Sequence, residues 1–152
     1  MPGFYSIKTD GWKRVPVSAD VNGFSCLQCK ERVDVIIGYN PPKDDLTNEE
    51  FLLHLATDSE RRRYLAKFEA AFKAKGQTFE LVHVQLGQIA GSRALLYNAK
   101  VITPTEVGYI AAFSGVQKHR IFTIQIGSHD EHLSPETIKT VNDFLATLSF
   151  EK

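Results

Sequence analysis

Hydrophobic positions along this chain change their spacing three times. They first alternate with polar positions or form short apolar runs, and between residues 46 and 76 they recur every three to four residues. They alternate again from residue 78 to 126 and then return to the longer spacing. Alternation puts side chains on the two faces of a strand, whereas the longer spacing puts them on one side of a helix. The chain is therefore predicted to run from strands to helix, to strands again, and to a last helix.

Short strands are predicted before the first helical region. Residues 4–8 form one candidate and residues 12–17 form another, separated by an Asp-Gly turn. Residues 32–39 alternate and then become wholly apolar, which is the pattern of a strand covered on both faces. Pro41 ends this strand because proline has no N–H to donate to a neighbouring strand. Two or three strands are expected in this part of the chain.

Residues 46–76 predict either two helices or one kinked helix. Thr47 with Glu50, and Thr57 with Glu60, match the capping box, in which the two side chains satisfy unpaired amides at a helix start. Gly76 supplies the C-terminal stop. The apolar positions that indicate one buried face are Phe51, Leu52, Leu55, Tyr64, Leu65, Phe68, Ala71 and Phe72.

Four alternating segments follow, at residues 79–86, 92–102, 107–113 and 119–126. The simplest arrangement for them is an antiparallel meander. In the first segment, Val82, Val84 and Leu86 are expected on one face, and His83 and Gln85 on the other.

A closing helix is predicted within residues 134–150, with Ser134 as the N-cap and Pro135 at the first helical position. Its expected apolar stripe consists of Ile138, Val141, Leu145 and Leu148. Runs of strands flanked by helices, without strand and helix alternating, indicate the α+β class, with an antiparallel sheet flanked by helices. The length suits a single domain over residues 1–152.

The charge balance makes nucleic acid an unexpected partner. Eighteen basic residues match 18 acidic ones, whereas nucleic-acid binders normally carry a basic surplus. The basic cluster at residues 61–63 follows Asp58 and Glu60 on a predicted helix, so we interpret it as a solvated helix face.

No apolar run approaches the ~20 residues that a membrane-spanning helix needs, so the chain is expected to be soluble. Its first residues lack the basic region and apolar core of a secretory signal. Two interpretations stay open. The protein is either cytoplasmic, or a mature periplasmic or membrane-anchored cell-envelope protein whose leader was removed.

Several features occur in a characteristic order along nearly the whole chain. They are Trp12 after an Asp-Gly turn, a helix near residues 47–75, the segments 87–97 and 109–128, and the final amphipathic helix. In this order the chain resembles the superfamily of PsbP-like and DcrB-like domains. The resemblance implies an α/β/α sandwich whose relatives mostly bind other proteins or serve in membrane-associated assemblies without turning over a substrate. No catalytic residues carry over from it.

The two cysteines, Cys26 and Cys29, are the sharpest chemical signal in the sequence, and they depart from the general pattern of that superfamily. A thioredoxin-like redox pair needs its first cysteine at a helix start, where the helix dipole stabilises the thiolate. A strand is predicted after this pair instead. The interpretation that we favour is a local disulfide, which the chain-entropy model values at about 2 kcal/mol for so short a loop and which suits an extracytoplasmic compartment.

Zinc binding is the alternative use of these cysteines. A structural zinc site needs four ligands, and His129 and His132 could complete a set with Cys26 and Cys29 if the fold brings the two loops together. Two reduced thiols without metal are also compatible with the sequence.

The sequence favours a non-catalytic binding or adaptor domain that contacts another protein or an apolar segment of one. It contains no Gly-x-Ser-x-Gly elbow and no His-Glu-x-x-His pair. We expect no enzyme activity and no cofactor, with zinc as the alternative. A carrier of a hydrophobic ligand is a further alternative, because ten phenylalanines could line a pocket.

Overall fold

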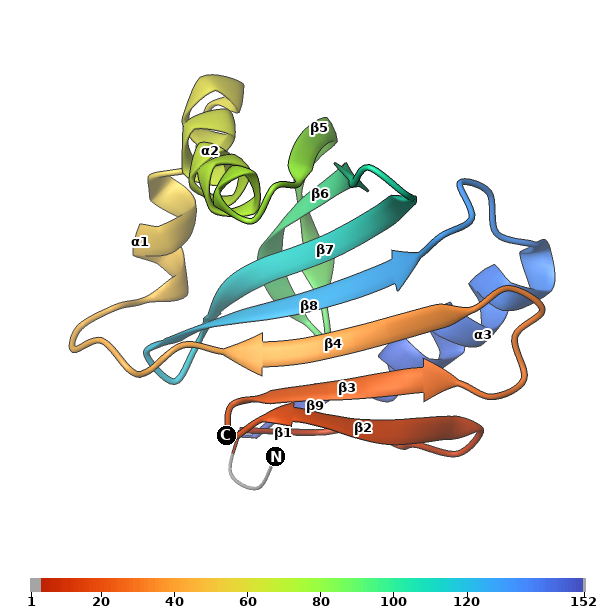
Figure 1. Cartoon of the computed structure of the whole chain (residues 1–152). Coiled ribbons are helices and arrows are strands. Elements are labelled where there is room, and N and C mark those ends of the chain that lie inside the picture. The colour runs from red at the N-terminus through yellow and green to blue at the C-terminus, as the bar shows by residue number, and fades with distance from the viewer. Residues whose placement is uncertain (1–3, 152) are drawn as a thin grey trace.

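The computed structural model describes residues 4–151. Within them, the strands form a seven-stranded sheet of order β2-β3-β4-β8-β7-β6-β5 and a two-stranded sheet β1-β9, with antiparallel neighbours throughout (Figure 1). The strands are β1 (Tyr5–Ser6), β2 (Trp12–Ser18), β3 (Val21–Cys26), β4 (Val33–Tyr39), β5 (Thr78–Ile89), β6 (Ser92–Ile102), β7 (Val107–Gln117), β8 (Arg120–Ser128) and β9 (Ser149–Phe150). The helices are α1 (Asn48–Leu53), α2 (Asp58–Ala74) and α3 (Pro135–Ala146).

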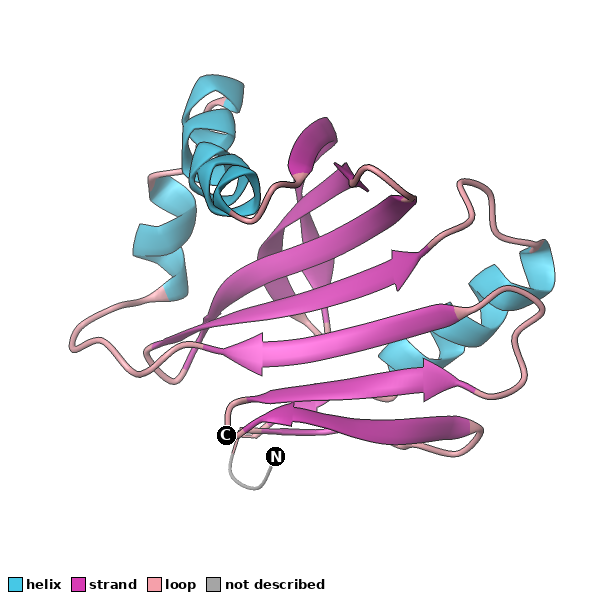
Figure 2. Cartoon of the chain, in the orientation of Figure 1, coloured by secondary structure: helices cyan, strands magenta, loops and turns pink. Residues whose placement is uncertain are grey.

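The helices lie on opposite faces of the large sheet, and each layer covers only part of its face. Figure 2 shows α1 and α2 together at one end of the molecule and α3 behind the other end. The α1–α2 layer packs on β5, β6 and β7, whereas α3 packs on the opposite face over β3, β4 and β8. The α+β class, the flanking helices and the antiparallel meander β5 to β8 are confirmed.

The sheet separates two hydrophobic cores. Ala94 and Leu95 are neighbours on β6 and both are fully buried, yet they belong to different cores because successive side chains point to opposite faces. Under α3, Phe144 stacks on Trp12 with 4.2 Å between ring centroids. Under α2, Phe72 stacks on Phe79 with 5.4 Å between centroids.

The helical region contains two helices, and the threonine of each predicted capping box caps its helix. The Thr47 hydroxyl accepts the Glu50 amide at 3.2 Å, and the Thr57 hydroxyl accepts the Glu60 amide at 3.1 Å. Since each threonine has extended backbone angles, each ends the preceding segment and starts a new helix. Within residues 4–151, no helix is long and apolar enough to cross a membrane.

Strand β3 was not predicted. It pairs with β2 on one side and with β4 on the other, although its central residues Asn22 and Gly23 have low strand propensity. Both are buried, because the sheet closes around them.

Both ends of the described chain also differ from the prediction. The first strand covers only Tyr5–Ser6, and its partner β9 lies within the residues predicted as the final helix. The helix ends earlier because the Thr147 hydroxyl turns back to the Phe144 carbonyl at 2.7 Å and accepts the Lys8 amide at 3.0 Å.

Two predicted side-chain orientations are wrong. Val82 is 55% exposed because a β-bulge between Leu81 and His83 shifts the register of β5, so that Val82 does not share a face with Val84. Ile138 is 46% exposed on α3.

The buried residue at the start of α3 is Thr137, which is 1% exposed. Its hydroxyl donates to a Glu31 carboxylate oxygen at 2.8 Å. Glu31 also accepts the Ser134 amide and, at 3.0 Å, the Ser134 hydroxyl. The loop between β3 and β4 therefore holds the N-terminus of α3, where the helix dipole also favours a negative charge.

Replacing Phe144 with alanine is expected to lower the free energy of unfolding by about 3–5 kcal/mol, because it removes a buried ring and leaves a cavity. Ile138→Ala on the same helix is the matched control and should stay within about 0.5 kcal/mol, because its side chain is largely exposed. Urea unfolding followed by circular dichroism measures both. Equal losses for the two variants would contradict the placement of α3.

Glu31→Gln is expected to destabilise the protein near neutral pH. The pKa of Glu31 is lowered in the folded state, chiefly because the Ser134 amide donates to the carboxylate. A lowered pKa stabilises the fold above the ordinary carboxyl pKa, and this contribution is lost as the pH falls through the folded-state value. The urea midpoints of wild type and variant should therefore converge in acid, whereas exposed Glu69→Gln should match wild type throughout. A gap independent of pH would contradict the assignment.

Candidate binding groove

One sheet face is left open next to the α1–α2 layer. Cross-strand register puts Val15, Gly23, Ile36 and Gln125 side by side on β2, β3, β4 and β8, on the face where Ala112 lies in the α1–α2 core. None of the helices within residues 4–151 covers these four strands on this side (Figure 1). Val15 is 40% exposed and Ile36 is partly buried. Apolar side chains therefore face solvent beside a raised helical wall.

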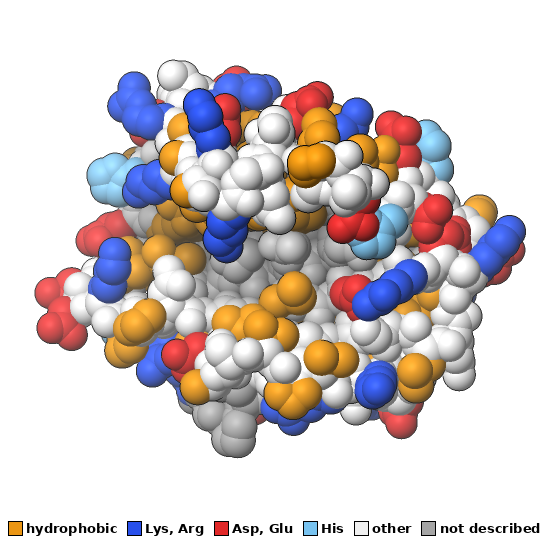
Figure 3. All heavy atoms as spheres, in the orientation of Figure 1, with side chains coloured by type: hydrophobic (Ala, Val, Ile, Leu, Met, Phe, Trp, Pro, Cys, Tyr) orange, Lys and Arg blue, Asp and Glu red, His pale blue; other side chains and the backbone are white. Residues whose placement is uncertain are grey.

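The open face is hollowed, and pockets lie at its two ends along α2. Figure 3 shows the hollow between the helices and the strands below them. On β8, Ile121 belongs to one pocket and Gln125 to the other, and both point to the same face. Thr123 lies between them on that face. We call the two pockets, these connecting residues and the uncovered face of β2, β3, β4 and β8 together the open groove.

The first pocket has a volume of about 490 Å³ and lies between the helices and the start of β8. Its apolar wall consists of Leu46, Phe51, Leu55, Tyr64 and Ile121. Its charged and titratable side chains are Lys43, Glu50, His54, Glu60, Arg63 and Lys67. We call it the basic pocket.

Specific hydrogen bonds fix the wall of the basic pocket to the sheet. The Asn48 side chain accepts the Val116 amide at 2.9 Å and donates to the Arg93 carbonyl at 3.0 Å, which ties the start of α1 to β6 and β7. His119 Nδ1 donates to the Leu46 carbonyl at 2.9 Å. The pocket is therefore built from residues far apart in sequence but tied by tertiary contacts.

The second pocket, of about 310 Å³, lies at the ends of β4, β7 and β8 under the C-terminal part of α2. Gly108 and Gly127 line it, and their missing side chains deepen the sheet surface there. Phe72 forms the helical wall. We call it the sheet-end pocket.

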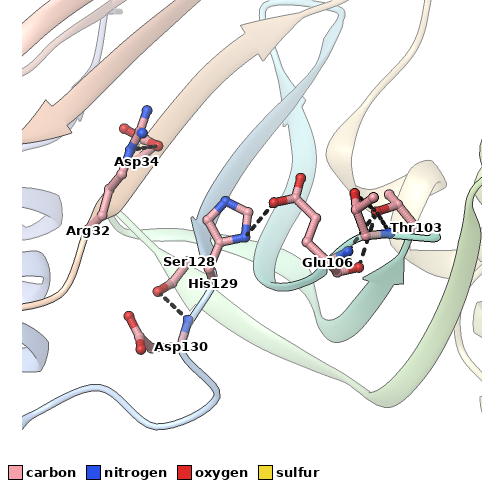
Figure 4. A network of polar contacts seen from close by, with 8 residues as sticks. Arg32, Asp34, Thr103, Glu106, Ser128, His129 and Asp130 are labelled. Atoms are coloured by element: carbon pink, nitrogen blue, oxygen red, sulfur yellow. Dashed lines mark hydrogen bonds and ion pairs between the residues drawn. The ribbon is translucent and has the colours of Figure 1, made fainter.

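A polar network borders the sheet-end pocket (Figure 4). Arg32 Nε lies 3.4 Å from the Asp34 carboxylate, and His129 Nδ1 lies 3.8 Å from the Glu106 carboxylate. Asp34 also accepts the Ser25 hydroxyl. The His129 and Glu106 side chains are each 60% exposed, so this pair contributes little to stability. Of the pair, His129 lines the sheet-end pocket.

Partly buried Tyr64 in the wall of the basic pocket and buried Tyr97 in the core of the same layer stay protonated near neutral pH. Burial raises the pKa of Tyr64, and burial together with the nearby Tyr64 raises the pKa of Tyr97 to about 12. These phenols can therefore donate hydrogen bonds but are poor bases.

The structure joins the two cysteines to each other. Cys26 ends β3, Cys29 lies in the following loop, and their sulfur atoms are 1.99 Å apart, as expected for a disulfide. The pair precedes a strand, so the helix start that a thioredoxin-like site requires does not follow it.

The structure does not assemble the four predicted zinc ligands. His129 is engaged with Glu106, and His132 is exposed in the loop before α3. Among the described residues, no group of three or more His, Cys, Asp or Glu side chains could hold a metal ion. Zinc binding through Cys26, Cys29, His129 and His132 would thus require a broken disulfide and a rearrangement, and it stays a prediction.

All ten phenylalanines pack in or against the two cores, which is what their helix and strand spacing indicated. Binding of a hydrophobic ligand inside the fold stays a prediction, because these rings already pack in the cores.

The open groove itself was missed from sequence. One signal for it was present in the sequence. Pro16 lies between Val15 and Val17, and because proline within a sheet is confined to edge strands, it indicates that these valines lie on an edge strand.

No family model and no curated protein matches this chain. Among solved structures, it is similar to cyanobacterial PsbP (CyanoP) from Synechocystis sp. PCC 6803, with 18% identity and a TM-score of 0.56 over 96% of this chain and 86% of that one. It is also similar to LpqN of Mycobacterium tuberculosis, described as involved in cell envelope biogenesis, with 13% identity and a TM-score of 0.55 over 100% of this chain and 87% of that one. At these identities the likeness shows the fold, and the chain has a PsbP-like fold, as the resemblance in its sequence predicted.

Proposed function

We propose that this protein is a non-catalytic binding domain of the cell envelope, and that its open groove receives a segment of a partner protein. The observation that carries the proposal is the uncovered half of the sheet beside α2, where Val15, Val17 and Ile36 bring apolar surface to solvent. Contiguous exposed apolar surface rimmed by polar residues is typical of interaction sites.

The distribution of perturbed ionisable groups supports a non-catalytic role. Active sites gather groups with shifted pKa values. Among the described residues, the resolved shifts belong to Glu31 and to Tyr5, Tyr64 and Tyr97. The tyrosines are shifted mainly by burial, and Glu31 is shifted by holding α3. Each shift is explained by the architecture of the fold.

Two observations support a location in the cell envelope. The Cys26–Cys29 disulfide suits an oxidising compartment, since cytosolic thiols are kept reduced. LpqN, which shares the fold, is described as involved in cell envelope biogenesis.

Photo-crosslinking in living cells tests this function. Benzoylphenylalanine at position 36, in the groove, is expected to form a discrete covalent product with one protein of the envelope fraction. The same group at position 138, exposed on α3 and away from the groove, is the matched control and is expected to give no such product. Equal products from both positions, or turnover of a small substrate that a single groove substitution abolishes, would refute the proposal.

A further inference from the structure

The basic pocket combines a small apolar wall with positive charges that have no acidic partner. Lys43, Arg63 and Lys67 line it, and none of them forms an ion pair with any residue in the range 4–151. Basic side chains surround an apolar patch at the left of the open face in Figure 3. The pocket thus offers both charge and apolar contact to a ligand.

The acidic side chains of the pocket offset this charge only in part: leaving His54 aside, three cations stand against two carboxylates, so the lining keeps a formal charge of +1. Glu60 accepts the Thr57 hydroxyl at 3.0 Å as part of the helix cap, so its carboxylate is held at the start of α2. Glu50 is the other carboxylate in the lining. Lys67 Nζ lies 5.6 Å from the Tyr64 ring centroid, so its side chain extends over the apolar wall.

The corner that carries these charges is firmly held. Arg61 donates to the Leu55 carbonyl at 2.9 Å and to the Ala56 carbonyl at 3.1 Å, which fixes the turn between α1 and α2. Arg62 is paired with Asp58 at 2.8 Å. Of the three arginines in this cluster, Arg63 is the one that lines the pocket.

The size and lining of the basic pocket favour a single apolar side chain as its occupant over a long lipid chain. The pocket of about 490 Å³ has five apolar or aromatic residues in its wall, and charged or titratable groups make up the rest of its lining. A lipid tail would lie against several of these polar groups, which are costly to desolvate without a partner. A single aromatic or aliphatic side chain can reach the wall while acidic neighbours meet the cations at the rim.

We propose that the basic pocket binds an acidic segment of the partner protein, which inserts one large apolar side chain against Phe51, Leu55 and Ile121 and places flanking carboxylates on Lys43, Arg63 and Lys67. The inference rests on the proposed function, because it specifies the chemistry of the segment that the open groove receives. Charge complementarity of this kind governs specificity and association rate.

An NMR titration of the full chain tests the inference with defined probes. The first is a capped peptide with a central phenylalanine and two aspartates on each side. The second has lysines in place of the aspartates, and the third is decanoate, an anionic amphiphile. The acidic peptide is expected to shift the amide signals of Leu46, Leu55 and Ile121 at millimolar concentration, and this binding should weaken as salt is raised. The lysine peptide should leave these signals unchanged.

Charge reversal at the rim supplies the matched control. Arg63→Glu with Lys67→Glu should weaken binding of the acidic peptide by about tenfold or more, since attraction is replaced by repulsion. Lys73→Glu with Lys75→Glu makes the same change in net charge near the other end of α2 and should leave the affinity within about twofold.

The inference is overturned if the acidic peptide leaves the pocket signals unchanged, if both double variants weaken it equally, or if decanoate alone occupies the pocket. Crosslinking at position 36 separates these failures from failure of the proposed function. A persistent product at position 36 without peptide binding leaves the groove function standing and rejects the acidic segment. Loss of the groove-specific product rejects the proposed function itself.

Discussion

The structure depends on one constraint. Both faces of the seven-stranded sheet carry apolar side chains that must be buried, and three helices in the described chain are available to cover them. Side chains alternate along every strand, so a central strand such as β6 sends Ala94 into one core and Leu95 into the other. The α1–α2 layer and α3 each screen part of one face, and they are displaced toward opposite ends of the sheet (Figure 1). Each layer therefore leaves part of its own face uncovered, and the open groove is the uncovered part beside α2.

The loop between β3 and β4 connects this sheet to its second helical layer. The disulfide between Cys26 and Cys29 closes the start of the loop, and Glu31, two residues later, receives the amide and hydroxyl groups at the start of α3. One short segment thus combines a covalent constraint with a helix cap. The cysteine pair is part of this connection, at the end of β3.

The groove and its charges follow from the same architecture. Val15 and Val17 on β2 are exposed and Ile36 on β4 is partly buried, and the wall of α2 rises beside this face where Phe72 and Ile36 line the same pocket. At one end, the corner between α1 and α2 adds unpaired cations to an apolar wall. At the other end, glycines and the pairs around Asp34 and Glu106 make a more polar surface. The two ends of the open groove therefore differ in chemistry.

The sequence by itself determined the local features of this protein. Capping residues such as Thr47 and Thr57 and the change of hydrophobic spacing were enough to place the helices, the meander and the α+β class, because these signals act over a few neighbouring residues. The Cys-x-x-Cys spacing likewise restricted the chemistry to a few alternatives. None of these signals contains information on which distant segments meet.

Only the tertiary structure decided the features that depend on distant contacts. Strand β3 forms around Asn22 and Gly23 because its neighbours provide hydrogen-bond ladders on both sides. Val82 is exposed because a β-bulge shifts the register of β5. Thr137 is buried in place of Ile138, and Glu31 reaches it from another loop. The groove belongs to the same group, since its wall comes from α2 and its floor from strands on either side of that helix in the sequence. The free energies of such alternatives differ by a fraction of a kcal/mol through local propensity. Burial and hydrogen bonds in the tertiary structure contribute more, at about 1–3 kcal/mol per side chain, and therefore decide the outcome.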